Sequence, residues 1–169
     1  MSLQVDLHLV KPFSLSGHEA VLSIYYTASC LKKRVDQMLD AVGLTDVQFN
    51  LMMLLKYQSS GDQGLGQTQL SEMMLVNRAN ITTLVDRMVK AGFVRRRGSA
   101  VDRRCNVIEL SEHGIRLLEQ IEPLYASEVM RIMAVLDKTA QLNLIEALEC
   151  VRKNISPRPT GKDGGCAFG

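Results

Sequence analysis

Residues 68–114 contain two helical periods followed by two strand-like runs, and this order restricts the fold more than any other feature of the chain. The hydrophobic spacing predicts a short helix over about 69–75 and a longer helix over 77–91. Two runs with strand character, 93–97 and 104–110, follow on either side of a Gly-Ser-Ala turn. Two helices joined by a tight turn and followed by a hairpin are typical of a helix-turn-helix with a β-wing.

Residues that favour helix ends mark the limits of these two helices. Thr68 and Asn77 are good N-cap residues, so each is predicted to open the helix that follows it. Gly92 suits the left-handed conformation that ends many helices. The apolar side chains of the longer helix recur on one face and are predicted to be buried: Ile81, Leu84, Val85 and Met88.

A long helix is predicted over 16–42, before this stretch. Its apolar residues alternate in steps of three and four, which is the spacing of a helix that packs along another helix: Val21, Ile24, Ala28, Leu31, Val35, Met38 and Val42. Ser16 to Glu19 has the form of a capping box, and so does Thr45 to Gln48, which is predicted to open a second helix. The buried face of that helix is predicted to carry Val47, Leu51, Leu54 and Leu55.

Two further helices are predicted after the hairpin. Ser111 is expected to cap a helix over about 112–136, and Asp137 a helix that reaches Asn154. Pro123 is expected to bend or divide the first of them. The segment 59–66 is predicted to be a loop from its Gly and Ser content.

The fold class that follows is mainly α with a small β-wing. A winged helix-turn-helix lobe over 45–111 is flanked by a helical dimerisation region, formed by residues 16–44 and 112–155. Residues 1–15 are a leader without clear periodicity, and 156–169 are rich in Pro and Gly and are predicted to be a disordered tail. The flanking helices carry more apolar surface than one protomer readily covers, which predicts a homodimer.

Positive charge is concentrated in one segment of the chain. Residues 77–104 contain eight Lys and Arg against two Asp and Glu, a net charge of +6, whereas the whole chain is +2 and the other 141 residues sum to −4. A compact basic element on an otherwise acidic body is typical of a protein that binds a phosphate backbone.

The outward face of the helix predicted over 77–91 carries arginines and short polar side chains. In the major groove of duplex DNA, Arg recognises guanine and Asn recognises adenine, and the first residues of a recognition helix usually reach the bases. We therefore predict base contacts from Arg78, Asn80 and Thr82, and contacts nearer the phosphates from Thr83 and Arg87.

Five arginines surround the predicted hairpin turn: Arg95, Arg96, Arg97, Arg103 and Arg104. These positive charges repel one another, which destabilises the hairpin in the absence of an anion. A nearby phosphate would attract them and make their electrostatic energy favourable. An arginine at such a tip can enter a narrow minor groove, where the potential is most negative. Asp102 lies two residues before Arg104, so its carboxylate is expected to hold that guanidinium in a fixed pose.

These motifs together resemble the winged helix-turn-helix of the multiple antibiotic resistance regulator (MarR) family. The matching marks are LVDRMVKAGFV, the D-x-R element from Asp102 to Arg104, and the exit from strand to helix formed by Leu110, Ser111 and Gly114. The motif match is confined to 68–114, although the order of helices is similar over about 17–155.

The resemblance implies a triangular homodimer that binds a palindromic operator in double-stranded DNA. The helix from Asn77 to Ala91 would enter the major groove, and Arg104, positioned by Asp102, the adjacent minor groove. Many members repress transcription and are released by small aromatic ligands or by thiol oxidation. A small aromatic effector is therefore expected, in a pocket between the dimer helices and the DNA-binding lobe lined by Tyr25, Tyr26, Phe49 and Met53.

Other chemistries find little support in the sequence. The four cysteines and three histidines have no spacing suited to zinc, so no metal and no cofactor are predicted. Since no phosphate loop, nucleophile elbow or triad order is present, we predict that the chain is not an enzyme. Charged residues interrupt every apolar run before the ~20 residues that a membrane span needs, and no secretory signal is evident, so a cytoplasmic protein is expected.

The sequence is also compatible with one other class of protein. A winged helix can serve as a protein–protein adaptor without reading DNA. An adaptor has no need of the basic segment over 77–104, and it would show no steep dependence of duplex binding on salt.

Overall fold

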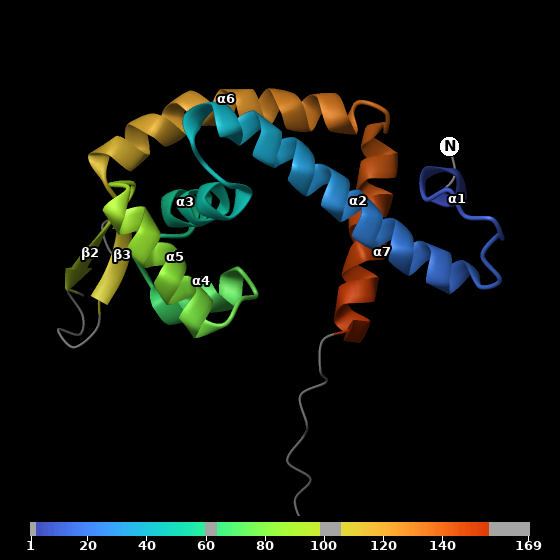
Figure 1. The fold of residues 1–169 in the computed structure, drawn as a ribbon, viewed down its shortest axis with the longest axis horizontal. Coiled ribbons are helices and arrows are strands. Elements are labelled where there is room, and N and C mark those ends of the chain that lie inside the picture. Colours follow the sequence, from blue (N-terminus) through green and yellow to red (C-terminus); the bar gives the residue numbers. More distant parts are fainter. Residues whose placement is uncertain (1–2, 60–63, 99–105, 156–169) are drawn as a thin grey trace, which may run out of the picture. The chain divides into compact units, whose positions relative to one another are not determined.

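The computed structural model describes residues 3–59, 64–98 and 106–155 of the chain (Figure 1). They form two compact units, Met1–Tyr125 and Ala126–Gly169, which are described separately. The first unit contains a short N-terminal helix, a long helix, a 3-10 turn, the three helices and small sheet of the winged lobe, and the first half of another long helix. In chain order these are α1 (Leu3–Asp6), α2 (Ser16–Leu39), η1 (Asp40–Val42), α3 (Asp46–Gln58), β1 (Leu65–Gly66), α4 (Gln67–Met73), α5 (Arg78–Lys90), β2 (Val94–Gly98), β3 (Asn106–Leu110) and α6 (Glu112–Met133).

The sheet has three antiparallel strands in the order β1-β3-β2. In β2 and β3, Arg95 lies opposite Glu109 and Arg96 lies opposite Ile108. The prediction of a loop over 59–66 is wrong at its end, because Leu65 and Gly66 pair with Ile108 and Val107. Burial explains the extra strand, since the Leu65 side chain is only 3% exposed and belongs to the core.

Four of the predicted caps are confirmed by the hydrogen bonds of the helix ends. The Thr45 hydroxyl accepts from the backbone N–H of Gln48 at 3.3 Å, and the Gln48 side chain accepts from the backbone N–H of Thr45 at 3.0 Å. The remaining three caps are single side-chain acceptors for the first-turn amides: Asn77 for Asn80 at 2.8 Å, Ser111 for Gly114 at 2.9 Å and Asp137 for Ala140 at 2.8 Å. Each contact satisfies a backbone donor that the helix leaves without a partner.

Two predicted caps are wrong. The N-cap of α2 is Leu15, which makes no side-chain cap, so Ser16 is already inside the helix. Helix α4 begins at Gln67 after Gly66, not after Thr68. Gly66 is the last residue of β1, so strand pairing places the start of α4 two residues earlier than predicted. The Gln69 side chain accepts from the Gly66 amide at 2.9 Å.

The core of the first unit lies where α3, α4, α5 and the sheet meet. Its fully buried side chains include Leu51, Met52, Leu70, Ile81, Val85, Met88, Ile108 and Leu118. The predicted stripe of α5 is confirmed for Ile81, Val85 and Met88, whereas Leu84 is half-buried against the core. In α3 the predicted face is partly wrong: Val47 is exposed, and Phe49 and Met52 are buried in its place.

Helix α6 starts against the base of the hairpin and is not divided at Pro123. Proline removes one backbone donor, and packing on both sides of it compensates. Ile121 is 2% exposed, and the Tyr125 ring meets the Phe49 ring edge-on with centroids 5.0 Å apart. The predicted division is therefore absent because the helix is anchored in the core before and after the proline.

The second unit contains the remainder of α6 and helix α7 (Lys138–Ile155). None of the α7 side chains is buried. Several of its apolar residues are exposed at helical spacing, among them Leu142, Ile145 and Val151. An apolar face without cover is unusual for a helix of a monomeric protein.

Within the described residues, no single helix is both long and apolar enough to cross a membrane. The segments Ser16–Val42 and Asp46–Gln58 satisfy length and composition only as a pair, and the two are bent by 84°.

Candidate nucleic-acid interface

Helix α5 presents the five predicted DNA-contacting side chains on its exposed surface. Arg78, Asn80, Thr82, Thr83 and Arg87 are all exposed, while the opposite side of the helix packs into the core. Asn77 caps α5 in an extended conformation, and the N-terminal end that it caps is the end where base contacts are expected. The structure therefore brings these residues together on one element.

The two threonines already use their hydroxyl protons inside the lobe. Thr82 Oγ1 lies 2.9 Å from the carbonyl oxygen of Arg78 and 3.3 Å from Oε1 of Gln67. Thr83 Oγ1 lies 3.1 Å from the carbonyl oxygen of Ala79. A hydroxyl that donates to its own helix keeps its lone pairs and its methyl group for a ligand. At a base edge, these side chains are therefore suited to accept a hydrogen bond or to contact a thymine methyl group.

The arginines of α5 and those of the hairpin have different surroundings. Among the residues that the structure describes, neither Arg78 nor Arg87 has an ion-pair partner. By contrast, Nη2 of Arg96 lies 2.6 Å from Oδ1 of Asp86, which is itself on α5. This ion pair ties strand β2 to the helix.

Arg95 and Arg97 share one carboxylate. Nε of Arg95 lies 2.6 Å from Oε1 of Glu109, and Nε of Arg97 lies 3.0 Å from Oε2 of the same residue. The count of charges over 77–104 missed Glu109 because this residue lies five positions beyond the segment. The positive field of the hairpin is accordingly weaker than the sequence count indicates.

The remaining predicted wing residues, Asp102, Arg103 and Arg104, lie outside the described residues. Gln67 was not predicted, although it contacts Thr82 and lines a hollow of about 300 Å³ with Arg96 and Asn106. Its position at the first turn of α4 is a weak signal in the sequence, because polar residues are common at helix starts.

A second candidate site lies among α2, α3 and α6 in the first unit. A pocket of about 290 Å³ is lined by Leu31, Lys32, Val35, Asp46, Phe49, Asn50, Met53 and Tyr125. It includes two of the four predicted ligand-lining residues, Phe49 and Met53. The other two, Tyr25 and Tyr26, lie earlier on α2, where their side chains are exposed.

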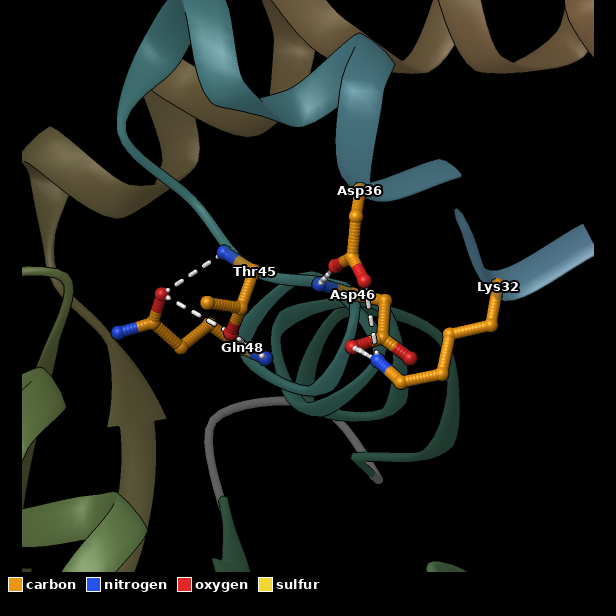
Figure 2. Close-up of polar contacts among 5 residues, drawn as sticks. All are labelled: Lys32, Asp36, Thr45, Asp46 and Gln48. Atoms are coloured by element: carbon orange, nitrogen blue, oxygen red, sulfur yellow. Dashed lines mark hydrogen bonds and ion pairs between the residues drawn. The ribbon is translucent and has the colours of Figure 1, made fainter. Parts of the chain in front are cut away.

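The polar side of this pocket is a network that joins α2 to the start of α3 (Figure 2). Nζ of Lys32 lies 2.5 Å from Oδ1 of Asp46 and 3.1 Å from Oδ2 of Asp36. The backbone N–H of Asp46 donates to Oδ1 of Asp36 at 2.9 Å. Hydrogen bonds to Asp46 and then to Asp36 raise the pKa of Lys32. The Asp46 amide, followed by Lys32, lowers the pKa of the Asp36 carboxyl.

Another polar cluster joins the end of α3 to α6. The Glu122 carboxylate accepts from Nζ of Lys56 at 2.5 Å and from the hydroxyl of Tyr57 at 2.8 Å. Hydrogen bonding to Glu122 raises the pKa of both Lys56 and Tyr57. This cluster fixes the first half of α6 to the lobe that carries α5.

The fold and this surface together define a winged helix-turn-helix protein whose helix α5 exposes two arginines. Residues 44–106 match the family model described as MarR family. The repressor YetL of Bacillus subtilis (strain 168) is 31% identical over 115 residues, which cover 68% of this chain and 68% of YetL. The fold is similar to that of AbsC from Streptomyces coelicolor, with a TM-score of 0.77 and 21% identity over 86% of this chain and 98% of AbsC. It is also similar to S. aureus MepR in a complex with DNA, with a TM-score of 0.71 and 17% identity over 78% of this chain and 93% of MepR.

The chain belongs to the MarR family. It is a DNA-binding transcriptional regulator, and its curated relatives are likewise transcriptional repressors and regulators. The resemblance inferred from 68–114 is thereby confirmed, as is the fold class with its winged helix-turn-helix.

Proposed function

We propose that this regulator binds a palindromic operator as a homodimer, represses transcription there, and is released by a small aromatic effector. One observation carries the DNA-binding part of the proposal: α5 exposes Arg78 and Arg87, which have no ion-pair partner in the described part of the chain. Exposed guanidinium groups without an ion-pair partner can contact phosphates or guanine, because no existing ion pair has to be broken first.

The roles of the individual residues follow from their positions on α5. Arg78, Asn80 and Thr82, in the first half of the helix, are assigned to base edges. Thr83 and Arg87 are assigned to contacts nearer the phosphates, and Arg96 of the wing lies beside α5 through its pair with Asp86. The minor-groove role of Arg104, positioned by Asp102, remains part of the proposal.

Exposed apolar rows support the homodimer. In the first unit, α2 exposes Val21, Ile24 and Leu31, which belong to its predicted heptad seam. In the second unit, α7 exposes Leu142, Ile145 and Val151. Apolar rows of this kind are commonly covered by a second copy of the same chain.

The pocket lined by Phe49 and Met53 supports an effector. Its volume of about 290 Å³ suits a small molecule, and aromatic and aliphatic side chains form most of its wall. It lies against the α2–α3 network, so a ligand inside it contacts residues that position the lobe. A ligand that prefers another placement of the lobe would reduce operator affinity by its differential affinity for the two states.

Selection of bound sites from random duplexes, followed by anisotropy titrations across salt concentrations, tests the DNA-binding part. We expect a palindromic consensus and a steep fall in affinity as salt rises. Arg78→Ala should weaken binding by about 1–3 kcal/mol and relax the base preference. Arg116→Ala removes the same charge from α6 and is the control.

Two results would contradict the proposal. A shallow salt dependence without any consensus would favour the protein–protein adaptor. An equal loss of affinity in Arg78→Ala and Arg116→Ala would show that total charge, rather than the α5 surface, determines binding.

A further inference from the structure

Glu109 has an unusual position for a carboxylate on a DNA-binding hairpin. It lies directly opposite Arg95 in the β2–β3 register, and its two oxygens accept from Nε of Arg95 at 2.6 Å and from Nε of Arg97 at 3.0 Å. Its side chain is only 15% exposed, whereas that of Arg95 is 66% exposed. A mostly covered carboxylate thus holds two more exposed guanidinium groups.

Successive side chains of a strand point to opposite faces of the sheet, and this alternation separates the three consecutive arginines of β2. Arg95 and Arg97 are two residues apart in β2 and therefore lie on the same face of the sheet. Arg96 lies on the other face, which it shares with the buried Val94, and it reaches Asp86 on α5. Only the middle arginine is on the side of the recognition helix.

The ion pairs of Glu109 keep this arrangement in place. If Arg95 and Arg97 turned toward a phosphate, the covered carboxylate would lose both of its partners, and an uncompensated charge in such a position is unfavourable. Both guanidinium groups are tied through Nε, the nitrogen nearest the aliphatic stem, so the contact restricts the whole side chain. The negative charge also repels any phosphate that approaches this face.

We propose that Glu109 is a positioning residue that holds Arg95 and Arg97 on the face of the hairpin opposite α5 and thereby limits the affinity for duplex DNA. This inference rests on the proposed DNA-binding function. It gives Arg95 and Arg97 little part in binding while Glu109 is charged, and it leaves Arg96 as the one of these three arginines on the side of α5.

Glu109→Gln tests the inference, since it removes the charge with little change of shape. Anisotropy titrations with a selected operator and with a mixed-sequence duplex should show an affinity about threefold to tenfold higher at low salt, with a steeper salt dependence, because the carboxylate that holds Arg95 and Arg97 and repels phosphates has lost its charge. Arg95→Ala and Arg97→Ala should each change affinity less than about twofold in the wild-type background. The same substitutions should cancel most of the gain in the Glu109→Gln background.

Glu112→Gln is the matched control, because Glu112 lies in the first turn of α6 and pairs with Arg116 at 3.7 Å instead of with a wing arginine. An equal gain of affinity in this control would overturn the inference, as would an unchanged or lower affinity in a folded Glu109→Gln protein.

If Glu109→Gln does not fold, a loss of more than about fivefold in Arg95→Ala or Arg97→Ala alone overturns it, and a loss below twofold in both supports it. If the wild-type protein does not bind duplex DNA at all, the proposed function itself is wrong. This result differs from wild-type binding that Glu109→Gln leaves unchanged, which overturns only the inference about Glu109.

Discussion

Leu75 occupies a backbone conformation that suits few residues. Its φ is 53°, in the left-handed region, and it lies in the turn between α4 and α5. The turn is held by the Ser71 hydroxyl, which donates to the carbonyl oxygen of Val76 at 2.6 Å. A β-carbon in this conformation costs about 1–2 kcal/mol, and asparagine tolerates it better than leucine. Since the Leu75 side chain is 92% exposed, little apolar burial offsets that cost.

We therefore predict that Leu75→Asn raises the free energy of unfolding by about 0.5–1 kcal/mol. The midpoint of urea denaturation measures it, and the dependence on urea concentration should be unchanged. Val10→Asn is the control, because Val10 is 95% exposed and its φ is not positive. An equal or lower midpoint in Leu75→Asn would contradict the strain at this turn.

Asp36 gives the protein a predictable response to acid. The Asp46 amide and Lys32 lower the pKa of its carboxyl in the folded state. A lowered folded-state pKa means that the stabilisation is complete above the ordinary carboxyl pKa, near 4, and is lost as the pH falls through the folded-state value. We predict that Asp36→Asn is less stable than the wild type at pH 7 and that the difference disappears in acid.

Urea denaturation at several pH values between neutral and about pH 3 checks this prediction. Glu146→Gln is the control, since Glu146 is an exposed residue of α7 with no hydrogen-bond or ion-pair partner among the described residues. A stability difference between Asp36→Asn and wild type that stays constant with pH would show that the network of Figure 2 does not act through the carboxylate charge.

At the scale of elements, the junction between the hairpin and α6 leaves no space for a side chain. A β-carbon on Gly114 would lie 2.1 Å from the carbonyl oxygen of Phe93. Because this oxygen belongs to the backbone, a change of side-chain rotamer cannot relieve the clash. The Ser111 hydroxyl at the same junction lies 2.5 Å from the carbonyl oxygen of Gly92 and accepts from the Gly114 amide at 2.9 Å. The first turn of α6 is thus pressed onto the end of α5 and the start of β2.

Gly114→Ala should accordingly lower the free energy of unfolding by about 1–3 kcal/mol, the range of overpacked core sites. Thermal and urea denaturation measure the change. Gly17→Ala provides the contrast, because a β-carbon there meets nothing within 4 Å and alanine favours a helix, so that variant should be unchanged or more stable. Similar effects of the two substitutions would show that the junction can rearrange.

At the scale of the whole molecule, the exposed apolar face of α7 predicts self-association. Ile145 is 51% exposed, and a charge at its position would have to be buried if a second copy covers this face. We predict that Ile145→Asp shifts sedimentation toward the monomer and weakens operator binding by at least tenfold, because one copy contacts only half of a palindrome.

Asn143→Asp adds the same charge to α7 at an exposed polar position and should leave the dimer intact. Analytical ultracentrifugation at matched concentrations separates the two variants. A wild-type protein that sediments as a monomer would refute the homodimer. If Ile145→Asp remains dimeric, the interface does not include this face of α7.

Local signals in the sequence were sufficient for most of the helices and for the exposed side of α5. The caps at Thr45, Asn77, Ser111 and Asp137 are contacts between residues three apart, so residue type and spacing alone predict them. The exposed side of α5 follows from the 3.6-residue period of its buried residues in the same way. The family motif over 68–114 was readable for the same reason, since its parts are close in sequence.

Contacts between distant residues were decided by the tertiary structure. Strand β1 exists because Leu65 is buried against Ile108, and this pairing also moves the start of α4. The pairing of Glu109 with Arg95 and Arg97 depends on the hairpin register, and the meeting of Asp46 with Lys32 depends on how α3 packs against α2. Side-chain type gives each charge in the sequence, but only the folded chain determines which opposite charge lies beside it, because Coulomb attraction depends on distance in space and not on separation along the chain.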